Sequence, residues 1–216
     1  MRHTLVNIAH RMFGRIGLYA LVRLARNGYL AQTGWMRAFY EQSPVNRAGL
    51  PIPWFTYPAL TFLEARTRPS FSVFEWGSGS STLWWASRVN RIISCEHDLI
   101  WYHRLKSRLP HNVELRLVPP DGTSQYAAEI HNTQGYFDVV VIDGIERIDC
   151  ARTALDRLHS SGVIVFDDTD RTQYTGAFDA LAAKGFRRID FPGMKAMSLS
   201  CSCTSIFYRS GNCLCI

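Results

Sequence analysis

Two segments of the chain combine residue types that suit a ligand with a ribose and a positive charge. The first, FEWGSGSST at residues 74–82, passes from an apolar run into a helix-forming run. Its glycines permit positive φ and let a ligand approach the backbone. Glu75 precedes the glycines and could reach a cationic group, while Glu96 ends the next apolar run and could accept hydrogen bonds from both ribose hydroxyls. This pattern predicts a cofactor site without a phosphate.

A dinucleotide such as NAD is the alternative ligand for a glycine loop of this kind. The dinucleotide fingerprint has a third glycine that allows the helix to pack closely on the strand. Thr82 stands at that position here. A nicotinamide-dependent oxidoreductase is therefore the less favoured interpretation.

Three carboxylates follow two continuous apolar runs further along the chain. Asp143 follows residues 139–142 (VVVI), and Asp167 and Asp168 follow residues 163–166 (VIVF). Ligands of open parallel sheets bind at the carboxyl ends of the strands, where these residues are expected to converge. Such a cluster either binds a divalent cation such as Mg²⁺ or leaves one acid with a raised pKa as a general base. Capping of the following helices is the structural alternative.

The elements that must position these residues alternate between strand-like and helix-like runs. This alternation predicts a doubly wound α/β fold with a mostly parallel sheet of seven strands. Strands are expected at residues 71–76, 91–96, 113–118, 137–143, 162–167, 186–191 and 205–208. Helices are expected at residues 81–89, 99–108, 126–130, 148–159 and 172–184. Residues 194–203 have no clear period and are expected to form a flexible loop on the acceptor side.

Residues 1–66 are expected to form an N-terminal extension of helices and a Pro/aromatic segment. Apolar residues recur at steps of three or four over residues 5–26, although Gly14 and Gly17 could split this helix in two. The helix either packs on the catalytic domain or contacts a membrane surface or a partner. Residues 43–57 are rich in proline and aromatic side chains, which predicts an ordered loop over the cofactor end, followed by a helix at 58–66.

Composition is that of one globular core, because 47% of the 216 residues are hydrophobic and 19% are charged. Residues 67–210 are expected to form the catalytic domain and residues 211–216 a loose tail that contains cysteines. The Cys-x-Cys pairs at 201–203 and 213–215 lack the usual zinc spacing. The sequence has no run of about 18 apolar residues, so no membrane-spanning helix is predicted. The protein is expected in the cytoplasm.

Glu75, Gly77 and Gly79, together with Glu96, resemble the class I S-adenosylmethionine-dependent methyltransferases. The first motif of that family has the form acid-x-Gly-x-Gly, and its second strand ends in an acid. This resemblance covers residues 71–209 and implies a Rossmann-like fold whose last strand is antiparallel. More narrowly, the combination of PIPWFTYPAL, VFEWGSGSSTLWWA, SCEHD, VVIDGIER and VIVFDDTDR resembles a group of bacterial methyltransferase-like proteins whose substrate is poorly defined.

The resemblance also implies roles for individual residues in binding S-adenosylmethionine. Glu96 would hold the ribose, and His97 and Trp101 would flank the adenine. The methionine end would be surrounded by six residues of the glycine loop: Glu75, Gly77, Ser78, Gly79, Ser81 and Thr82.

The carboxylates are similar in arrangement to those of metal-dependent O-methyltransferases. That similarity implies Mg²⁺ bound by Asp143, Asp167 and Asp168, where the metal would lower the pKa of a substrate hydroxyl. Catechol-type members use a lysine as the base after the first Asp, whereas this sequence has Arg147 nearby. Arginine is a poor base but a good clamp for anions, so Asp143 and Arg147 are the expected catalytic residues and the acceptor could be anionic.

The function expected from the sequence is methyl transfer to an oxygen of a small molecule or saccharide. An RNA methyltransferase is an alternative because five arginines lie within residues 1–26, although no RNA-binding module accompanies them. A non-catalytic cofactor-binding or membrane-associated protein is another alternative. The residues leave the identity of the acceptor and the oligomeric state open.

Overall fold

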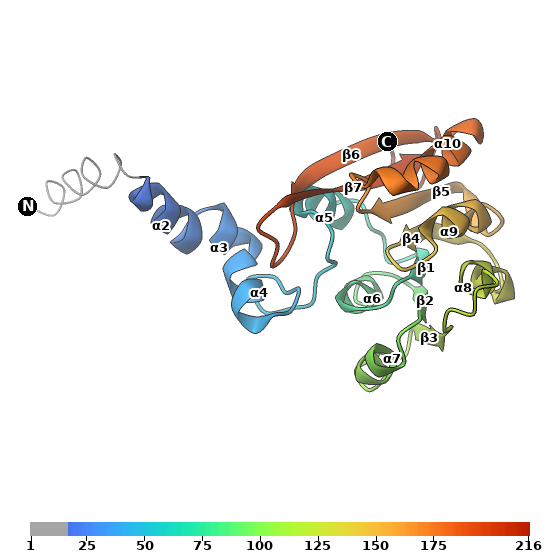
Figure 1. Ribbon diagram of the computed structural model, residues 1–216, viewed down its shortest axis with the longest axis horizontal. Helices are drawn as coiled ribbons and strands as arrows, with labels where there is room; N and C mark the ends of the chain where they lie inside the picture. The colour runs from blue at the N-terminus through green and yellow to red at the C-terminus, as the bar shows by residue number, and fades with distance from the viewer. Residues whose placement is uncertain (1–16) are drawn as a thin grey trace, which may run out of the picture.

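The computed structural model describes residues 17–216 of the chain, and these form a seven-stranded sheet covered by helices on both faces (Figure 1). The strand order is β3-β2-β1-β4-β5-β7-β6. The first five strands in this order are parallel, and β7 runs antiparallel to both β5 and β6. The predicted fold class is confirmed, and the order reverses between β1 and β4, which is where ligands bind in such sheets.

The strands are β1 (Ser72–Trp76), β2 (Arg91–Glu96), β3 (Val113–Leu117), β4 (Phe137–Ile142), β5 (Leu158–Asp167), β6 (Arg187–Met194) and β7 (Cys201–Tyr208). The α-helices are α2 (Leu18–Arg26), α3 (Tyr29–Thr33), α4 (Trp35–Glu41), α5 (Tyr57–Glu64), α6 (Ser80–Ala86), α7 (Leu99–Lys106), α8 (Gln125–Ala128), α9 (Arg147–Ala154) and α10 (Thr175–Ala183). Two short 3₁₀ helices are η1 (Glu129–Asn132) and η2 (Thr172–Tyr174).

The central strands are buried on both faces because their side chains alternate between two hydrophobic clusters. In β4, Val139 and Val141 pack with the cluster that includes residues of α5 and α6, whereas Val140 and Ile142 pack with residues of α9 and α10. β5 divides its residues between the clusters in the same way. The continuous apolar runs of the sequence therefore have the burial that their composition predicts.

The largest errors in the predicted boundaries involve the ends of long strands. The helix expected at 148–159 ends at Ala154, because Leu158 is buried and pairs with Phe137 at the start of β4. Residues 201–203, expected in a flexible loop, belong to β7, where Cys201 pairs with Met194 of β6. The loop between β6 and β7 is therefore short, and the hairpin brings it back toward the carboxyl ends of the parallel strands.

The N-terminal helices extend from one side of the sheet domain (Figure 1). The part of the predicted helix before Gly17 lies outside the described residues; α2 begins after Gly17, whose φ is 68°. Two indole groups tie the following segment to the β6–β7 loop: Trp35 Nε1 donates to the carbonyl of Ser198 at 2.8 Å, and Trp54 Nε1 to that of Ala196 at 2.6 Å. Within residues 17–216, no helix has the length and hydropathy to cross a membrane.

The C-terminal segment is packed rather than loose, contrary to the sequence expectation. The backbone N–H of Cys213 donates to the carbonyl of Ser161 at 2.7 Å, and Leu214 is buried in the hydrophobic core. Cys95 and Cys150 are buried, as expected for small apolar residues of the core.

Candidate functional site

A cavity of about 1020 Å³ opens at the carboxyl ends of β1, β2, β4 and β5. One wall is the glycine loop after β1 together with the residues that follow β2. The rest of the lining comes from the acidic ends of β4 and β5, the β6–β7 loop and Trp54 of the N-terminal extension. The volume is at the upper end of the range for small-molecule sites, which leaves room for a cofactor and an acceptor together.

The glycine loop approaches the end of β4 so closely that a side chain would not fit. Gly77 has a φ of 94°, and its N–H donates to the carbonyl of Cys95 at 3.0 Å. A Cβ at this position would lie 2.7 Å from the carbonyl carbon of Asp143 and 2.8 Å from its oxygen. The N–H of Gly79 donates to Thr82 Oγ1 at 2.9 Å, which fixes the turn into α6. Gly77, Ser78, Gly79 and Ser81 all line the cavity.

Glu75 and Thr82 lie behind this loop and do not line the cavity. Thr82 Oγ1 and Ser94 Oγ donate to Glu75 Oε2 at 2.5 and 2.7 Å. Burial raises the pKa of Glu75 to about 7, although hydrogen bonds from Ser81, Thr82 and Ser94 oppose the increase. Among the described residues, Oε1 of Glu75 has no hydrogen-bond partner. The structure therefore places both residues as supports of the loop.

Glu96 lines the cavity at the end of β2 and is held in one orientation. Its Oε1 accepts the backbone N–H groups of His97 and Asp98 at 2.8 and 2.9 Å, and its Oε2 accepts the Ser78 hydroxyl at 2.6 Å. The Nδ1 atom of His97 lies 3.1 Å from Glu96 Oε1. A carboxylate with two oxygens retains acceptor capacity for ligand hydroxyls.

Trp101 connects α7 to the glycine loop. Its indole Nε1 donates to the carbonyl of Ser78 at 2.9 Å, and a Cβ on Gly79 would lie 3.8 Å from the same nitrogen. Asp98 caps α7 by accepting the N–H of Trp101 at 2.7 Å. Glu96, His97 and Trp101 thus lie together beside the glycine loop and line the cavity. These residues and the side-chain-free loop fit a ligand that combines a ribose, an aromatic base and a small zwitterionic chain.

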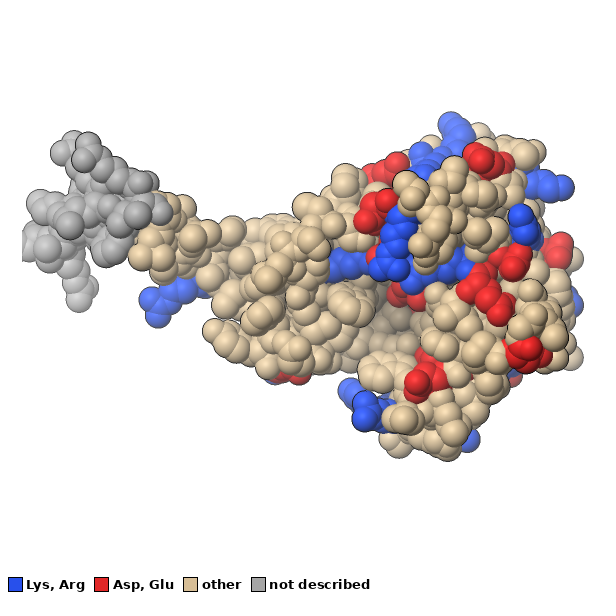
Figure 2. Space-filling model, in the orientation of Figure 1, with Lys and Arg blue, Asp and Glu red and all other residues tan. Residues whose placement is uncertain are grey.

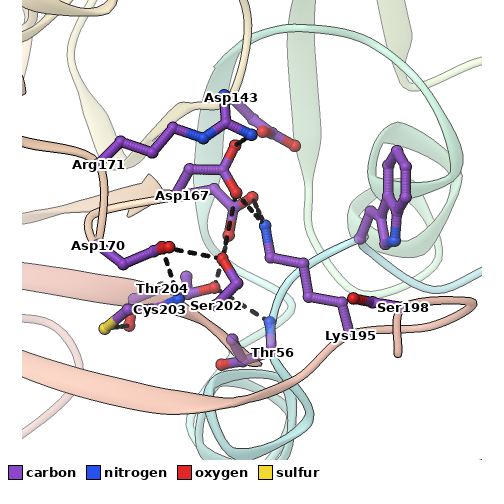
Figure 3. A network of polar contacts seen from close by, with 12 residues as sticks. Thr56, Asp143, Asp167, Asp170, Arg171, Lys195, Ser198, Ser202, Cys203 and Thr204 are labelled. Carbon is purple, nitrogen blue, oxygen red and sulfur yellow. Dashed lines mark hydrogen bonds and ion pairs between the residues drawn. The ribbon is translucent and has the colours of Figure 1, made fainter. Parts of the chain in front are cut away.

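The three aspartates predicted to converge do so at the ends of β4 and β5, where they line the same cavity. One oxygen from each of Asp143, Asp167 and Asp168 lies within 4.8 Å of the others, and this is the one such group found among the described His, Cys, Asp and Glu residues. Figure 3 shows Lys195 reaching into the group from the β6–β7 loop. Its Nζ contacts Asp167 Oδ2 and lies 2.5 Å from Asp168 Oδ1.

Arg147 at the start of α9 is buried, and its guanidinium donates its hydrogen bonds to other groups of the chain. Its guanidinium makes five hydrogen bonds, which matches the five N–H groups that an arginine has. The acceptors are the carbonyls of Gly144, Asp143 and Asp167 and the carboxylates of Asp143 and Asp168. The residue therefore holds the ends of β4 and β5 together instead of presenting free donors to an anion.

The three carboxylates differ in pKa because their partners differ. Burial and the charge of Asp167 raise the pKa of Asp143 well above its usual value, and Arg147 offsets part of the increase. Burial also raises the pKa of Asp167, against the opposing charge of Lys195. Burial alone would raise the pKa of Asp168, but Lys195 and the two nearby arginines bring it below its usual value. Asp143 is thus the acid of the cluster that most readily holds a proton.

Lys195 is the principal site residue that the sequence did not indicate. It is buried, although it lies in a segment without periodicity that was expected to be flexible. One signal was available, since lysine is scarce here: the chain contains three, at positions 106, 184 and 195. A lone lysine beside strand ends rich in aspartate is a candidate ion-pair partner.

Comparison with protein-family models and with curated protein sequences finds no match. Solved structures do match. The precorrin-6y C5,15-methyltransferase of Geobacter metallireducens has a TM-score of 0.55 at 20% identity, covering 71% of this chain and 87% of that one. The O-methyltransferase TomG of Streptomyces achromogenes, in complex with S-adenosylmethionine, has a TM-score of 0.55 at 20% identity, covering 83% and 88%.

An rRNA methylase of Streptococcus thermophilus also matches, with a TM-score of 0.53 at 13% identity over 71% of this chain and 97% of that one. At these identities the likeness establishes the fold. The chain has the seven-stranded, Rossmann-like fold of the class I S-adenosylmethionine-dependent methyltransferases, as the sequence motifs predicted.

Proposed function

We propose that this protein transfers a methyl group from S-adenosylmethionine to an oxygen of a small molecule or saccharide. The observation that carries the proposal is one cavity whose lining includes the glycine loop, Glu96 and Asp143. Cofactor-binding and proton-accepting groups therefore share one cavity. The fold it shares with the methyltransferase TomG, which was solved with S-adenosylmethionine, supports the same reading.

The cofactor would lie along the wall formed by the ends of β1 and β2. Glu96 would accept the ribose hydroxyls, Trp101 and His97 would border the adenine, and the loop at 77–79 would leave space for the methionine chain. When bound, S-adenosylmethionine supplies a methyl group on a positively charged sulfur. Glu75 and Thr82 would act indirectly, because they fix the loop from behind.

Asp143 is the residue suited to take the proton from the hydroxyl that receives the methyl group. Arg147 holds it through Oδ1 at 3.1 Å, and no hydrogen bond among the described residues uses Oδ2. That oxygen is on a carboxylate that lines the cavity, so a hydroxyl placed there can donate its proton to it. Alignment of the hydroxyl by the cavity wall would supply the rest of the catalysis.

The Mg²⁺ ion expected from the sequence has no role in this proposal. The oxygens it would need on Asp167 and Asp168 already accept hydrogen bonds from Lys195, Thr204 and Arg147. RNA is the alternative acceptor, favoured by the arginines near the N-terminus. Binding of RNA that weakens steeply with added salt would distinguish that case.

Calorimetric titration with S-adenosylmethionine and S-adenosylhomocysteine tests the proposal. Wild-type protein should bind both, and Glu96→Ala should lower the affinity by roughly a hundredfold because two hydrogen bonds to a charged acceptor are lost. Glu64→Ala is the matched control, since Glu64 is an exposed acid on α5. Binding would then justify a screen of hydroxyl acceptors by release of S-adenosylhomocysteine. Absence of binding, or binding of NAD instead, would refute the proposal.

A further inference from the structure

The charges around the acidic cluster are already balanced by side chains of the chain. Asp143, Asp167 and Asp168 form ion pairs with Lys195 and two arginines, Arg147 and Arg171. Three negative and three positive groups therefore share one partly buried site. A divalent cation added to this arrangement would leave two uncompensated positive charges, which is costly away from bulk water.

The same oxygens that a metal would need are occupied in the structure. Asp168 Oδ1 accepts Lys195 Nζ at 2.5 Å and the Ser202 hydroxyl at 3.2 Å, and its Oδ2 is paired with Arg147 and Arg171. Asp167 Oδ2 contacts Lys195, and its Oδ1 accepts the Thr204 hydroxyl at 2.6 Å. Figure 3 shows dashed contacts from the ammonium group of Lys195, which joins Asp167 and Asp168.

From this arrangement we propose that Lys195 is the built-in cation of the acidic cluster and takes the place of a divalent metal. It joins the ends of two aspartates and neutralises them, which leaves Asp143 as the carboxylate open to the acceptor. In the reaction proposed above Lys195 is a positioning residue, but the prediction that the site rejects metal does not depend on methyl transfer.

Titration with Mn²⁺, followed by electron paramagnetic resonance, tests this without any acceptor. The wild-type protein should bind no Mn²⁺ at the acidic cluster, so Asp167→Asn should leave its Mn²⁺ titration unchanged. Lys195→Ala should gain affinity for Mn²⁺ by at least about tenfold, because the carboxylates lose their cation and coordinate oxygen-seeking metals. Lys195→Arg, which keeps the charge, and Lys184→Ala, an exposed lysine after α10, should show no gain.

Stoichiometric Mn²⁺ binding by the wild type that Asp167→Asn abolishes would overturn the proposal. So would a folded Lys195→Ala protein without any gain in affinity. Because the wild-type titration decides the matter alone, the proposal stays testable even if Lys195→Ala fails to fold. A failure of cofactor binding would refute the proposed function and leave this result intact.

A second inference rests on the distribution of charge along the chain. Residues 1–40 contain six arginines and no lysine, aspartate or glutamate. The remaining 18 basic residues equal the 18 acidic residues of the chain, so the whole net charge of +6 belongs to the N-terminal 40 residues. The catalytic domain carries no excess charge of its own.

The helix α2 within that segment exposes an apolar face. Leu18, Leu21 and Val22 follow helical spacing and are 47%, 61% and 43% exposed, and α2 buries no residue. By the same spacing Arg23 lies away from this apolar face, whereas Arg26, four residues after Val22, lies at its edge. Figure 2 shows that helices α2 to α4, the N-terminal arm, project from the domain. Their surface is mainly uncharged, with positive charge on one side.

We infer that α2 docks on a membrane surface that contains anionic lipids. Apolar side chains would enter the headgroup boundary while the arginines contact lipid phosphates, which is the pattern of interfacial helices. RNA would use the arginines but would leave the leucines in water, and a second copy of the chain would bring two positively charged arms together. The anionic lipid surface matches both features.

Sedimentation with vesicles tests this on the full chain. The protein should bind vesicles of phosphatidylcholine with about 30% phosphatidylglycerol, and scarcely bind phosphatidylcholine alone. Leu21→Ser with Val22→Ser, and separately Arg23→Gln with Arg26→Gln, should each weaken binding by about tenfold or more. Tyr136→Ser, which changes an exposed aromatic residue before β4, should have no effect.

Three outcomes would overturn the docking proposal. The first is no binding to anionic vesicles. The second is a self-associated form, seen by light scattering, that the Leu21→Ser and Val22→Ser changes convert to monomer while vesicle binding is unaffected. The third is salt-sensitive RNA binding that needs the arginines but not the leucine and valine side chains.

Discussion

Arg147 holds Asp143 by one carboxylate oxygen, with its Nη2 donating to Oδ1 at 3.1 Å. The same guanidinium binds three backbone carbonyls and Asp168, so it connects the ends of β4 and β5. Replacing it with methionine would leave these buried acceptors and charges without partners. The free energy of unfolding should fall by about 3–5 kcal/mol.

Denaturant unfolding of Arg147→Met against Arg152→Met measures this effect. Arg152 is on the same helix, but its side chain is 60% exposed, and its ion pair with Asp149 is the one it makes among the described residues. Loss of an exposed ion pair should cost at most about 1 kcal/mol. Equal stability of the two variants would contradict the structural role assigned to Arg147.

Asp143→Asn should separate binding from chemistry. The amide keeps the size of the side chain but cannot accept a proton, so the turnover rate should fall by roughly 10²–10⁴-fold with the acceptor that the screen selects. The affinity for S-adenosylhomocysteine should stay within about twofold, because the cofactor contacts are assigned to Glu96, His97 and Trp101 and not to the side chain of Asp143. An unchanged rate would exclude Asp143 as the base.

The pH profile gives a second test of the same residue. Since the pKa of Asp143 lies well above its usual value, the ionised base forms only as the pH rises through that higher range. The rate should therefore increase with pH in the wild type, and Asp143→Asn should lose this limb of the profile. A limb that persists in the variant would assign the titration to another group.

Glu75 should make the stability of the protein depend on pH. Its carboxyl releases a proton near pH 7 in the folded state instead of near the ordinary 4.5. The folded state holds the extra proton between these values, so the free energy of unfolding should fall as the pH rises from about 4.5 to 7, by about 3 kcal/mol in total.

Glu75→Gln removes this titration and should show a flatter stability curve between pH 4.5 and 7. Chemical denaturation of the wild type and the variant across this range gives the difference directly. Glu64→Gln serves as the control because Glu64 is exposed. Parallel curves for the wild type and Glu75→Gln would show that Glu75 titrates normally.

The parts of the site that the sequence predicted are those encoded by short, local patterns. The glycine loop, Glu96 and the three aspartates all stand at the ends of apolar runs, and parallel strands bring such ends to one edge. Even the bounds of β2, Arg91–Glu96, agree with the prediction. Local pattern and global topology point to the same answer here.

Lys195 could not be found in this way because its partners are distant in sequence. It lies 28 positions from Asp167, and only the β6–β7 hairpin brings its ammonium group to the carboxyl ends of the parallel strands. The sequence pattern predicts a helix at Leu158 for a similar reason, because the strand pairing of Leu158 with Phe137 is a long-range contact. The ion pairs of Lys195 and the length of β5 both depend on tertiary contacts, which the periodicity of apolar residues in the sequence does not reveal.

Gly77 offers the sharpest test of how the loop forms the cofactor site. Alanine there would have to adopt a φ of 94°, and its Cβ would lie within 2.8 Å of the Asp143 carbonyl. The backbone of the loop or of the β4 end must then move, at a cost of at least roughly 1–3 kcal/mol in unfolding free energy. Affinity for S-adenosylhomocysteine should fall with it, because the loop lines the cavity in which the cofactor is proposed to bind.

Gly176→Ala is the matched control for this prediction. Gly176 is in α10, and a Cβ there meets no atom within 4 Å, so the change should stabilise the helix by about 0.5–1 kcal/mol without altering cofactor affinity. Thermal unfolding and calorimetry on both variants distinguish a general effect of replacing glycine from an effect of this loop. If Gly77→Ala retained wild-type stability and affinity, the close contact between the loop and Asp143 could not be what shapes the site.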